Sequence, residues 1–309
     1  MDLSVIVPVY NEEGNIKELY IQIRDAVSSL GLSYEIIFVN DGSTDRTEEL
    51  LRKVYSKVKD LKIINFRRNF GQSAAMLAGF RIAKGKYIVS IDGDLQNDPK
   101  DIPALLAKLE SGYDVVSGWR FRRKDTFFKR FFSRFASLLR RKFLGMKIHD
   151  YGCSLKAYKR EALSGIELYG EMHRYIPPLL QWKGFRIGEV KVSHRNRQAG
   201  RTKYGVSRLY KGFIDMGVVW FWQKYSSRPM HMFSFIGILA GGFGVFCTFY
   251  SMYLKMIRDV SLSDTFLPTM AVFSIMIGAQ MFVTGILADI IIKNYYKDSE
   301  PYSIKDILE

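Results

Sequence analysis

Cysteine and histidine are scarce in this sequence, which has two cysteines and four histidines among its 309 residues. Cys153 falls in a mixed polar segment and Cys247 in a long apolar run, so we expect no disulfide and a reducing compartment for the polar part. The histidines lack the spacing of metal ligands, and we expect them to have structural roles. These absences argue against a disulfide-stabilised extracellular domain.

A glycine-rich loop is also missing after the first apolar run, residues 3–10. Glu12 and Glu13 stand where a dinucleotide-binding fold would cradle a pyrophosphate, and their charges would repel it. We therefore expect no NAD or FAD site. No basic residue precedes the apolar run, so we also expect no signal peptide at this end.

Charged residues are absent from two long stretches, residues 233–254 and 265–288. Each stretch is longer than the roughly 20 residues that a bilayer span needs. We therefore predict two transmembrane helices, at about 233–254 and 265–292. The alternative is a buried helical hairpin in a soluble core, where uncharged runs of this length are rare.

The net charge of +15 calls for an anionic partner. Basic residues cluster in residues 120–142, which would suit either nucleic acid or anionic lipid head groups. The sequence has no helix-turn-helix pattern and no zinc-finger spacing. Together with two predicted spans, this favours a membrane surface and argues against a nucleic-acid partner.

An amphipathic segment occupies residues 127–143 within that basic region. Phenylalanines and leucines recur on one side at helical spacing, and lysines and arginines cover the other side. This pattern is typical of a helix lying in the plane of a membrane. A helix packed on a globular domain would show a similar stripe, and this alternative stays open. Residues 206–222 form a second candidate of the same kind.

Apolar runs alternate with helical segments in the first part of the chain, which predicts a mostly parallel sheet with helices on both faces. Asp45 and Glu48 have the spacing of a capping box for the second helix. We expect strands at 3–10, 34–40, 61–65, 87–92 and 114–118, and helices at 15–30, up to residue 55, and at 71–83.

The fourth predicted strand runs into the acidic segment VSIDGDLQNDP, residues 89–99. Asp92, Asp94 and Gln96 are spaced by two, so in an extended chain their oxygens would share one face. Hard oxygen donors suit Mg²⁺ or Mn²⁺. The alternative is an Asx-rich turn in which Asp98 and Pro99 cap the next helix.

Polar residues follow the other strands as well, and in a parallel sheet all of them meet at the carboxyl edge, where ligands bind. We expect a nucleotide there, held by its base and ribose at the first two loops and by its diphosphate, through a metal, at the third. The first two loops contribute Tyr10, Asn11, Glu12, Asp41 and Ser43.

Several motifs carry a family resemblance. IVPVYNEEGNI, VNDGSTD, RNFGQSAAMLAGF and SIDGDLQNDP resemble family 2 glycosyltransferases of the GT-A fold. SGWR, DYGCSLKAYKRE, HRYIP and HRNRQAGRTKYG look like the branch that uses polyprenyl phosphates, which includes dolichyl-phosphate mannose synthases and undecaprenyl-phosphate aminoarabinose and glucose transferases. Processive polysaccharide synthases carry a Q-x-x-R-W signature, and the nearest Gln-Trp pair, Gln181 and Trp182, does not continue that pattern.

The resemblance implies an inverting enzyme that moves one sugar from a nucleotide sugar to a polyprenyl phosphate. UDP-glucose is the favoured donor and GDP-mannose is possible. The alternative is an inactive, membrane-anchored protein that binds nucleotide sugar or lipid. The implied site residues are catalytic Asp92, Asp94 and Asp150; nucleotide-sugar ligands Pro8, Tyr10, Asn11, Glu12, Asp41, Ser43, Asp92 and Gly93; metal ligands Asp94 and Gln96; and lipid-phosphate ligands Arg120, Lys129, Ser133, Arg201 and Lys203.

Asp150 begins the motif in which relatives carry an active-site aspartate. Many relatives have a further acid directly after the glycine, where this chain has Cys153. Asp150 therefore either accepts a proton or orients the acceptor, and the motif does not decide between these roles.

The resemblance also implies a membrane assembly. We expect a multi-pass inner-membrane protein with its catalytic domain in the cytoplasm, packed as a homo-oligomer, with a tetramer favoured over a dimer. Gly237, Gly241 and Gln280 suit contacts between the spans. The expected parts are a catalytic domain at 1–205, a juxtamembrane helix at 206–228, the spans within 229–292, and a cytoplasmic tail at 293–309.

Overall fold

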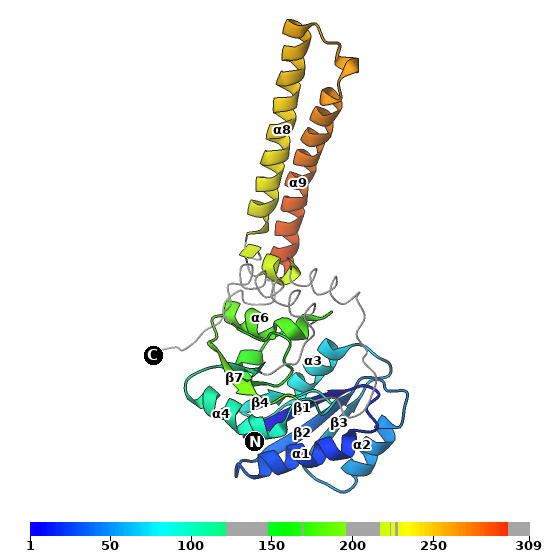
Figure 1. Ribbon diagram of the computed structural model, residues 1–309, viewed down its shortest axis with the longest axis vertical. Helices are drawn as coiled ribbons and strands as arrows, with labels where there is room; N and C mark the ends of the chain where they lie inside the picture. Colours follow the sequence, from blue (N-terminus) through cyan, green and yellow to red (C-terminus); the bar gives the residue numbers. More distant parts are fainter. Residues whose placement is uncertain (122–147, 169, 196–216, 223, 226–227, 296–309) are drawn as a thin grey trace. The chain divides into compact units, whose positions relative to one another are not determined.

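The computed structural model describes residues 1–121, 148–168, 170–195, 217–222, 224–225 and 228–295 (Figure 1). The chain divides into two compact units, Met1–Trp220 and Phe221–Glu309. The expected interfacial helix at 127–143 lies outside the described residues, as does most of the juxtamembrane segment. Four of the expected lipid-phosphate ligands also lie outside them: Lys129, Ser133, Arg201 and Lys203.

A single mixed sheet forms the centre of the first unit. In the described part of the chain it has seven strands in the order β3-β2-β1-β4-β6-β5-β7. Neighbouring strands are parallel except at β6, which is antiparallel to both β4 and β5. The strands are β1 (Leu3–Val9), β2 (Tyr34–Asn40), β3 (Leu61–Asn65), β4 (Tyr87–Ser90), β5 (Val115–Arg120), β6 (Lys156–Lys159) and β7 (Ile187–Val192). The predicted mostly parallel sheet is confirmed.

The strand predictions succeed where apolar runs are long. β2 and β3 have the predicted bounds. The side chains of β2 are almost all buried, as in a strand covered on both faces, whereas β3 lies at the edge of the sheet and buries Leu61 alone among its residues. β4 is shorter than predicted and ends at Ser90, so Ile91 and Asp92 already lie beyond the strand. β6 and β7 were not predicted. The four residues of β6 are too few to show a period, and only their pairing with β4 and β5 makes them a strand.

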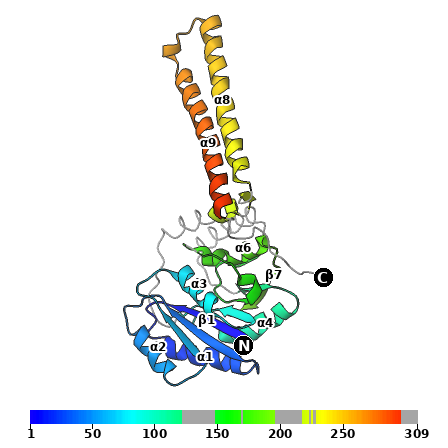
Figure 2. The same cartoon turned by 180° about the vertical axis from the view of Figure 1, so that it is seen from behind.

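Helices cover both faces of the sheet (Figure 2). α1, α2 and α4 pack on one face, and α3, α6 and the short helix η3 pack on the other. Their bounds are α1 (Ile16–Ser28), α2 (Thr47–Tyr55), α3 (Gln72–Ile82), η1 (Pro99–Asp101), α4 (Ile102–Glu110), η2 (Arg160–Leu163), η3 (Met172–Tyr175) and α6 (Ile176–Trp182).

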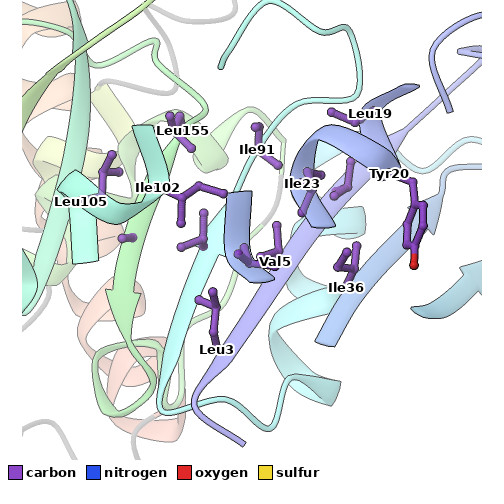
Figure 3. Packing of buried hydrophobic residues seen from close by; sticks show 14 of the residues in the cluster. Leu3, Val5, Leu19, Tyr20, Ile23, Ile36, Ile91, Ile102, Leu105 and Leu155 are labelled. Atoms are coloured by element: carbon purple, nitrogen blue, oxygen red, sulfur yellow. The ribbon is translucent and has the colours of Figure 1, made fainter. Parts of the chain in front are cut away.

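The alternation of side chains along β1 divides the core into two layers. Leu3 and Val5 point into the layer beneath α1 and α4, where they belong to the same cluster as Ile23 and Leu105 (Figure 3). Ile6 points to the other face and packs with the residues of α3. Each fully buried aliphatic side chain contributes about 1.5–3 kcal/mol, so β1 anchors both layers of the fold.

The predicted capping box at α2 forms only in part. The residue directly before α2 is Arg46, whose side chain makes no capping hydrogen bond. Asp45 accepts hydrogen bonds from the amides of Thr47, the first residue of α2, at 3.0 Å, and Glu13, at 3.2 Å. Glu48 forms an ion pair with Arg52 at 2.7 Å on the helix surface. The contact with Glu13 ties the loops after β1 and β2 together, which local spacing cannot reveal.

The second unit contains two long helices, α8 (Pro229–Arg258) and α9 (Leu267–Tyr295), separated by the short helix η4 (Leu262–Asp264). Both helices are long and apolar enough to cross a membrane. They approach closely at glycines: a Cβ atom added to Gly237 would lie 2.9 Å from the carbonyl oxygen of Gly278. Gln280 is exposed on α9. The two cysteines are free, as expected.

Candidate functional site

The loops after β1 and β2 form one interlocked structure at the carboxyl edge. The amide of Asn11 donates to Ser43 Oγ at 2.9 Å, and the amide of Thr44 donates to Asn11 Oδ1 at 2.8 Å. The amide of Glu12 donates to Thr47 Oγ1 at 2.9 Å. Asn11 has a φ of 51°, a left-handed conformation that asparagine tolerates better than most residues. These bonds hold three of the expected nucleotide-binding residues at one position on the edge.

Asp41 is buried and connects this edge to a third loop. Its carboxylate accepts hydrogen bonds from the amides of Phe70, at 2.7 Å, and Gly71, at 3.0 Å, and from Asn69 Nδ2 at 2.9 Å. Burial raises the pKa of Asp41, and the two backbone hydrogen bonds offset part of that rise. Both oxygens are thus engaged in positioning the loop before α3, and the expected contact between Asp41 and a base stays a prediction.

Asp92 lies just beyond β4 and contacts the first residue of α3. Gln72 Nε2, at the start of α3, donates to Asp92 Oδ1 at 2.6 Å. Burial raises the pKa of Asp92, and the nearby charge of Asp94 raises it further. The two expected acidic residues are therefore close enough to influence each other, as a shared cation would require.

The backbone from Asp94 to Gln96 forms a turn, so the prediction that the chain is extended after β4 is wrong. Leu95 has a φ of 58°, and Asp94 Oδ1 accepts a hydrogen bond from the amide of Gln96 at 3.2 Å. Asp98 accepts from the amide of Lys100 at 3.1 Å and begins η1. The Asx-rich turn considered as the alternative is therefore present. It does not exclude the cation, because an Asx turn leaves carboxylate lone pairs available.

The donor set fits a hard divalent cation that is completed by substrate. Among the described residues, no group of three histidine, cysteine or acidic side chains is placed to hold a metal ion. Two carboxylates and an amide are nevertheless sufficient where diphosphate oxygens and water fill the remaining positions, as Mg²⁺ sites in phosphate-binding proteins commonly do. Such a cation would also stabilise the ionised forms of Asp92 and Asp94, because it would offset the repulsion between the two carboxylates.

Asp150 and Arg120 form a bidentate ion pair on the other half of the sheet. Arg120 Nε lies 2.6 Å from Asp150 Oδ2, and Arg120 Nη2 lies 2.9 Å from Oδ1. Burial alone would raise the pKa of Asp150, but the hydrogen bonds and charge of Arg120 outweigh it and hold that pKa below its usual value. Asp150 is thus kept ionised, and its oxygens are engaged with the guanidinium.

Glu189 on β7 supports this pair. Glu189 Oε1 accepts hydrogen bonds from the amides of His149, at 2.8 Å, and Asp150, at 3.3 Å, while Oε2 lies 2.8 Å from His149 Nδ1. The ring of His149 stacks on Trp119 at 4.1 Å between centroids. His149 therefore has a structural role, as expected from the sequence.

A small cavity beside Asp92 brings together residues to which sequence reasoning gave no role. Gln72 belongs to the motif RNFGQSAAMLAGF, and His173 and Arg174 belong to HRYIP. Lys156, on the unpredicted strand β6, is almost fully buried, with 2% of its surface exposed. The cavity is lined by Gln72, Asp92, Tyr151, Lys156, His173 and Arg174, among others. Buried charge was the available signal, but it appears only after folding.

The family model described as "Glycosyl transferase family 2" matches residues 4–166. The chain belongs to glycosyltransferase family 2. The predicted GT-A-like fold and the predicted glycosyltransferase class are thereby confirmed, and the alternatives of an inactive sensor and a nucleic-acid-binding protein are disfavoured.

Curated relatives match nearly the whole chain. A dodecaprenyl-phosphate galacturonate synthase from Rhizobium johnstonii is 38% identical, with 100% of this chain and 94% of the relative covered. An undecaprenyl-phosphate 4-deoxy-4-formamido-L-arabinose transferase from Shewanella sediminis is 31% identical, with 99% and 92% covered. The predicted resemblance to the polyprenyl-phosphate branch is confirmed.

Solved structures support the same fold. Glucosyl-3-phosphoglycerate synthase from Mycobacterium tuberculosis in complex with UDP aligns at a TM-score of 0.52 and 20% identity, covering 72% of this chain and 79% of that one. Its complex with Mn²⁺ and UDP-glucose aligns at a TM-score of 0.51 and 21% identity, covering 72% and 78%. At this identity the likeness concerns the fold alone.

Proposed function

We propose that this glycosyltransferase moves one sugar from a nucleoside-diphosphate sugar to a polyprenyl phosphate at a membrane surface, with inversion at the anomeric carbon. The observation that carries the proposal is the placement of an acidic pair, Asp92 and Asp94, on the same edge of the sheet as the Arg120–Asp150 ion pair. The names of the full-length relatives support the acceptor class.

The donor side uses the loops after β1, β2 and β4. Asp94 and Gln96 would hold Mg²⁺ or Mn²⁺ with the diphosphate, and Pro8, Tyr10, Asn11, Glu12, Ser43 and Gly93 surround the nucleotide. A divalent cation bound there supplies positive charge against the leaving diphosphate. The Mn²⁺ and UDP-glucose bound by a structural neighbour support this arrangement and favour a uridine nucleotide.

The acceptor needs little activation. A phosphate monoester has a second pKa of about 6, so it is largely a dianion at neutral pH. One of its oxygens attacks C1 of the sugar, the bond between C1 and the β-phosphate oxygen breaks, and the nucleoside diphosphate leaves. Positioning should then dominate catalysis.

The ionisation of Asp150 indicates which of its two proposed roles it has. Its low pKa makes it a poor proton acceptor, and its bidentate contact fixes the guanidinium of Arg120. We therefore infer that Asp150 orients Arg120 toward the acceptor phosphate. Lys129, Ser133, Arg201 and Lys203 remain proposed ligands of the same phosphate.

The two apolar helices indicate where in the cell the reaction would take place. α8 and α9 would span the inner membrane twice, which returns the tail to the side of the catalytic unit, and the supply of nucleotide sugars favours the cytoplasmic side. The exposed Gln280 would be costly against lipid, so it favours a homo-oligomer, with a tetramer preferred.

The test is incubation of the purified full-length protein with a polyprenyl phosphate, Mg²⁺ or Mn²⁺, and a panel of labelled nucleotide sugars. The panel includes UDP-glucose, GDP-mannose, UDP-galacturonate and UDP-4-deoxy-4-formamido-L-arabinose. We expect label in the lipid phase with at least one donor, and none with the Asp94→Asn variant. Transfer to water alone with every donor would overturn the acceptor class.

A further inference from the structure

The cavity beside Asp92 is small, and most of the side chains that line it carry a polar group. Its volume is about 40 Å³. A cavity needs roughly 10–15 Å³ to hold one water molecule, so this cavity has room for about three water-sized groups. It therefore suits a small polar substituent and would not enclose a whole pyranose ring.

Cations outnumber anions among the residues that line this cavity. Lys156 and Arg174 are cationic, while Asp92 is the one acid among the lining residues, all of which lie in the described ranges. Asp92 is already engaged, since it accepts a hydrogen bond from Gln72 at 2.6 Å. The lining thus carries an excess of positive charge and hydrogen-bond donors.

Lys156 makes this excess unusual because a buried ammonium group is costly without a partner. It is 2% exposed, and its Nζ donates to the neutral backbone carbonyl of Cys153. Burial lowers the pKa of Lys156, while the negative charges of Asp150 and Asp92 act in the opposite direction. An ammonium has three donors, so Lys156 retains capacity for an oxyanion in the cavity.

Arg174 approaches the cavity from η3, on the other face of the sheet from α1. Its side chain is 31% exposed, and Arg174 Nε lies 3.5 Å from Glu171 Oε2. A guanidinium has five N–H donors, so Arg174 can bind an oxyanion in addition to its other contacts. His173 beside it is tied by its Nδ1 to Ser73 Oγ at 2.9 Å, which fixes the start of this segment against α3.

We propose that this cavity is an oxyanion subsite in which Lys156 and Arg174 bind a carboxylate or phosphate group of a substrate. The inference rests on the proposed function for the identity of the two substrates. A uronosyl donor would bring a carboxylate on C6, and the lipid acceptor would bring its phosphate. The donor carboxylate fits better, because Asp92 adjoins the proposed diphosphate site and the cavity has the size of one carboxylate.

The experiment compares two donors that differ only at C6, UDP-galacturonate and UDP-galactose. Calorimetry on the full-length protein with Mn²⁺ measures the ratio of their dissociation constants. Because Arg174→Gln removes a charge-assisted hydrogen bond, it should reduce the preference for the uronate about tenfold or more. Arg174→Lys should retain most of it. This binding measurement is independent of whether any sugar is transferred, so it separates the subsite from the proposed function.

A second arm measures the apparent affinity for polyprenyl phosphate in the same variants. If the uronate preference is unchanged and the lipid affinity falls about tenfold, the oxyanion is the acceptor phosphate. If Arg174→Gln and Lys156→Met change neither quantity, the subsite is overturned. Because Lys156→Met could unfold the protein, its thermal unfolding is measured as well. If that variant does not fold, the result for the partly exposed Arg174 tests the subsite by itself.

The matched control is Arg81→Gln. Arg81 forms a comparable arginine–glutamate pair with Glu167 at 3.2 Å, and its side chain is 65% exposed on the surface of α3. The substitution removes one positive charge from the same unit without touching the cavity. An equal loss of uronate preference in Arg81→Gln would mean that long-range charge alone explains the effect, and it would also overturn the subsite.

Discussion

The two halves of the sheet hold their polar groups by different means. On the β3-β2-β1-β4 half, Asn11, Ser43 and Asp41 are held largely by hydrogen bonds that involve backbone amides. On the β6-β5-β7 half, Asp150 is held by the buried guanidinium of Arg120, and Lys156 brings a second buried cation. The comparison shows that neutral backbone donors hold the polar groups of one half, whereas buried cations hold those of the other. We assign the first half to the nucleotide and the Arg120–Asp150 pair to the acceptor phosphate. The two halves should therefore respond differently to substitution and to pH.

The largest expected effect comes from removing the carboxylate that would hold the cation against the diphosphate in the donor half. Asp94→Ala should lower turnover about 1,000-fold or more, equivalent to about 4 kcal/mol of transition-state stabilisation. The fold should persist, since the carboxylate lies in a turn at the edge of the sheet. Turnover at saturating Mg²⁺ or Mn²⁺ and the melting temperature measure the two quantities. Unchanged turnover would remove Asp94 from the metal site.

The next effect belongs to the charged half. Asp150→Ala leaves Arg120 buried without its partner, and breaking a buried ion pair in this way costs about 3–5 kcal/mol of stability. Both side chains are well buried, at 14% and 12% exposed, so little of this is lost to solvent screening. Denaturation of the detergent-solubilised protein measures the change. The double variant Arg120→Met/Asp150→Leu should recover part of the stability without recovering use of the lipid phosphate.

The pH dependence of stability should separate the halves further. The pKa of Asp150 is lower in the folded protein than the ordinary value of about 3.9, so its pairing contributes fully at pH values above about 5. That contribution is lost as the pH falls below about 4, through the folded pKa. Melting temperatures from pH 7 to pH 3 should therefore fall less steeply in Asp150→Asn than in the parent. Parallel curves would contradict the role of the ion pair.

The smallest expected effect lies in the neutral half. Ser43→Ala removes the oxygen that accepts from the amide of Asn11, a single neutral hydrogen bond worth about 1 kcal/mol. The cost should be independent of pH between 3 and 7, in contrast to that of Asp150→Asn. Nucleotide-sugar binding should weaken while lipid use is retained. A pH-dependent loss of stability in Ser43→Ala would show that the two halves are not separable in this way.

Local sequence patterns were sufficient to predict much of the fold of this protein. The apolar run predicted β2 with its bounds, because a strand buried on both faces needs no polar positions. The short segment LKIIN predicted β3, whose side chains are mostly only partly buried. The absence of charge over two long stretches predicted α8 and α9, and the motifs predicted the family. The position of Asp92 and Asp94 beyond the fourth strand was also predicted, since they follow directly from a recognisable strand, and their roles stay predictions.

Only the tertiary structure decided which distant groups meet. Arg120 and Asp150 belong to different segments and pair because β5 and the loop before β6 come together; Lys156 is buried because its short strand inserts between β4 and β5. The turn at Leu95 and the use of Asp45 as a tie between loops likewise depend on neighbours far along the chain. Sequence patterns report interactions within a turn or along a strand, whereas these arrangements arise from contacts whose partners are distant in sequence, and nothing in either local segment encodes the other.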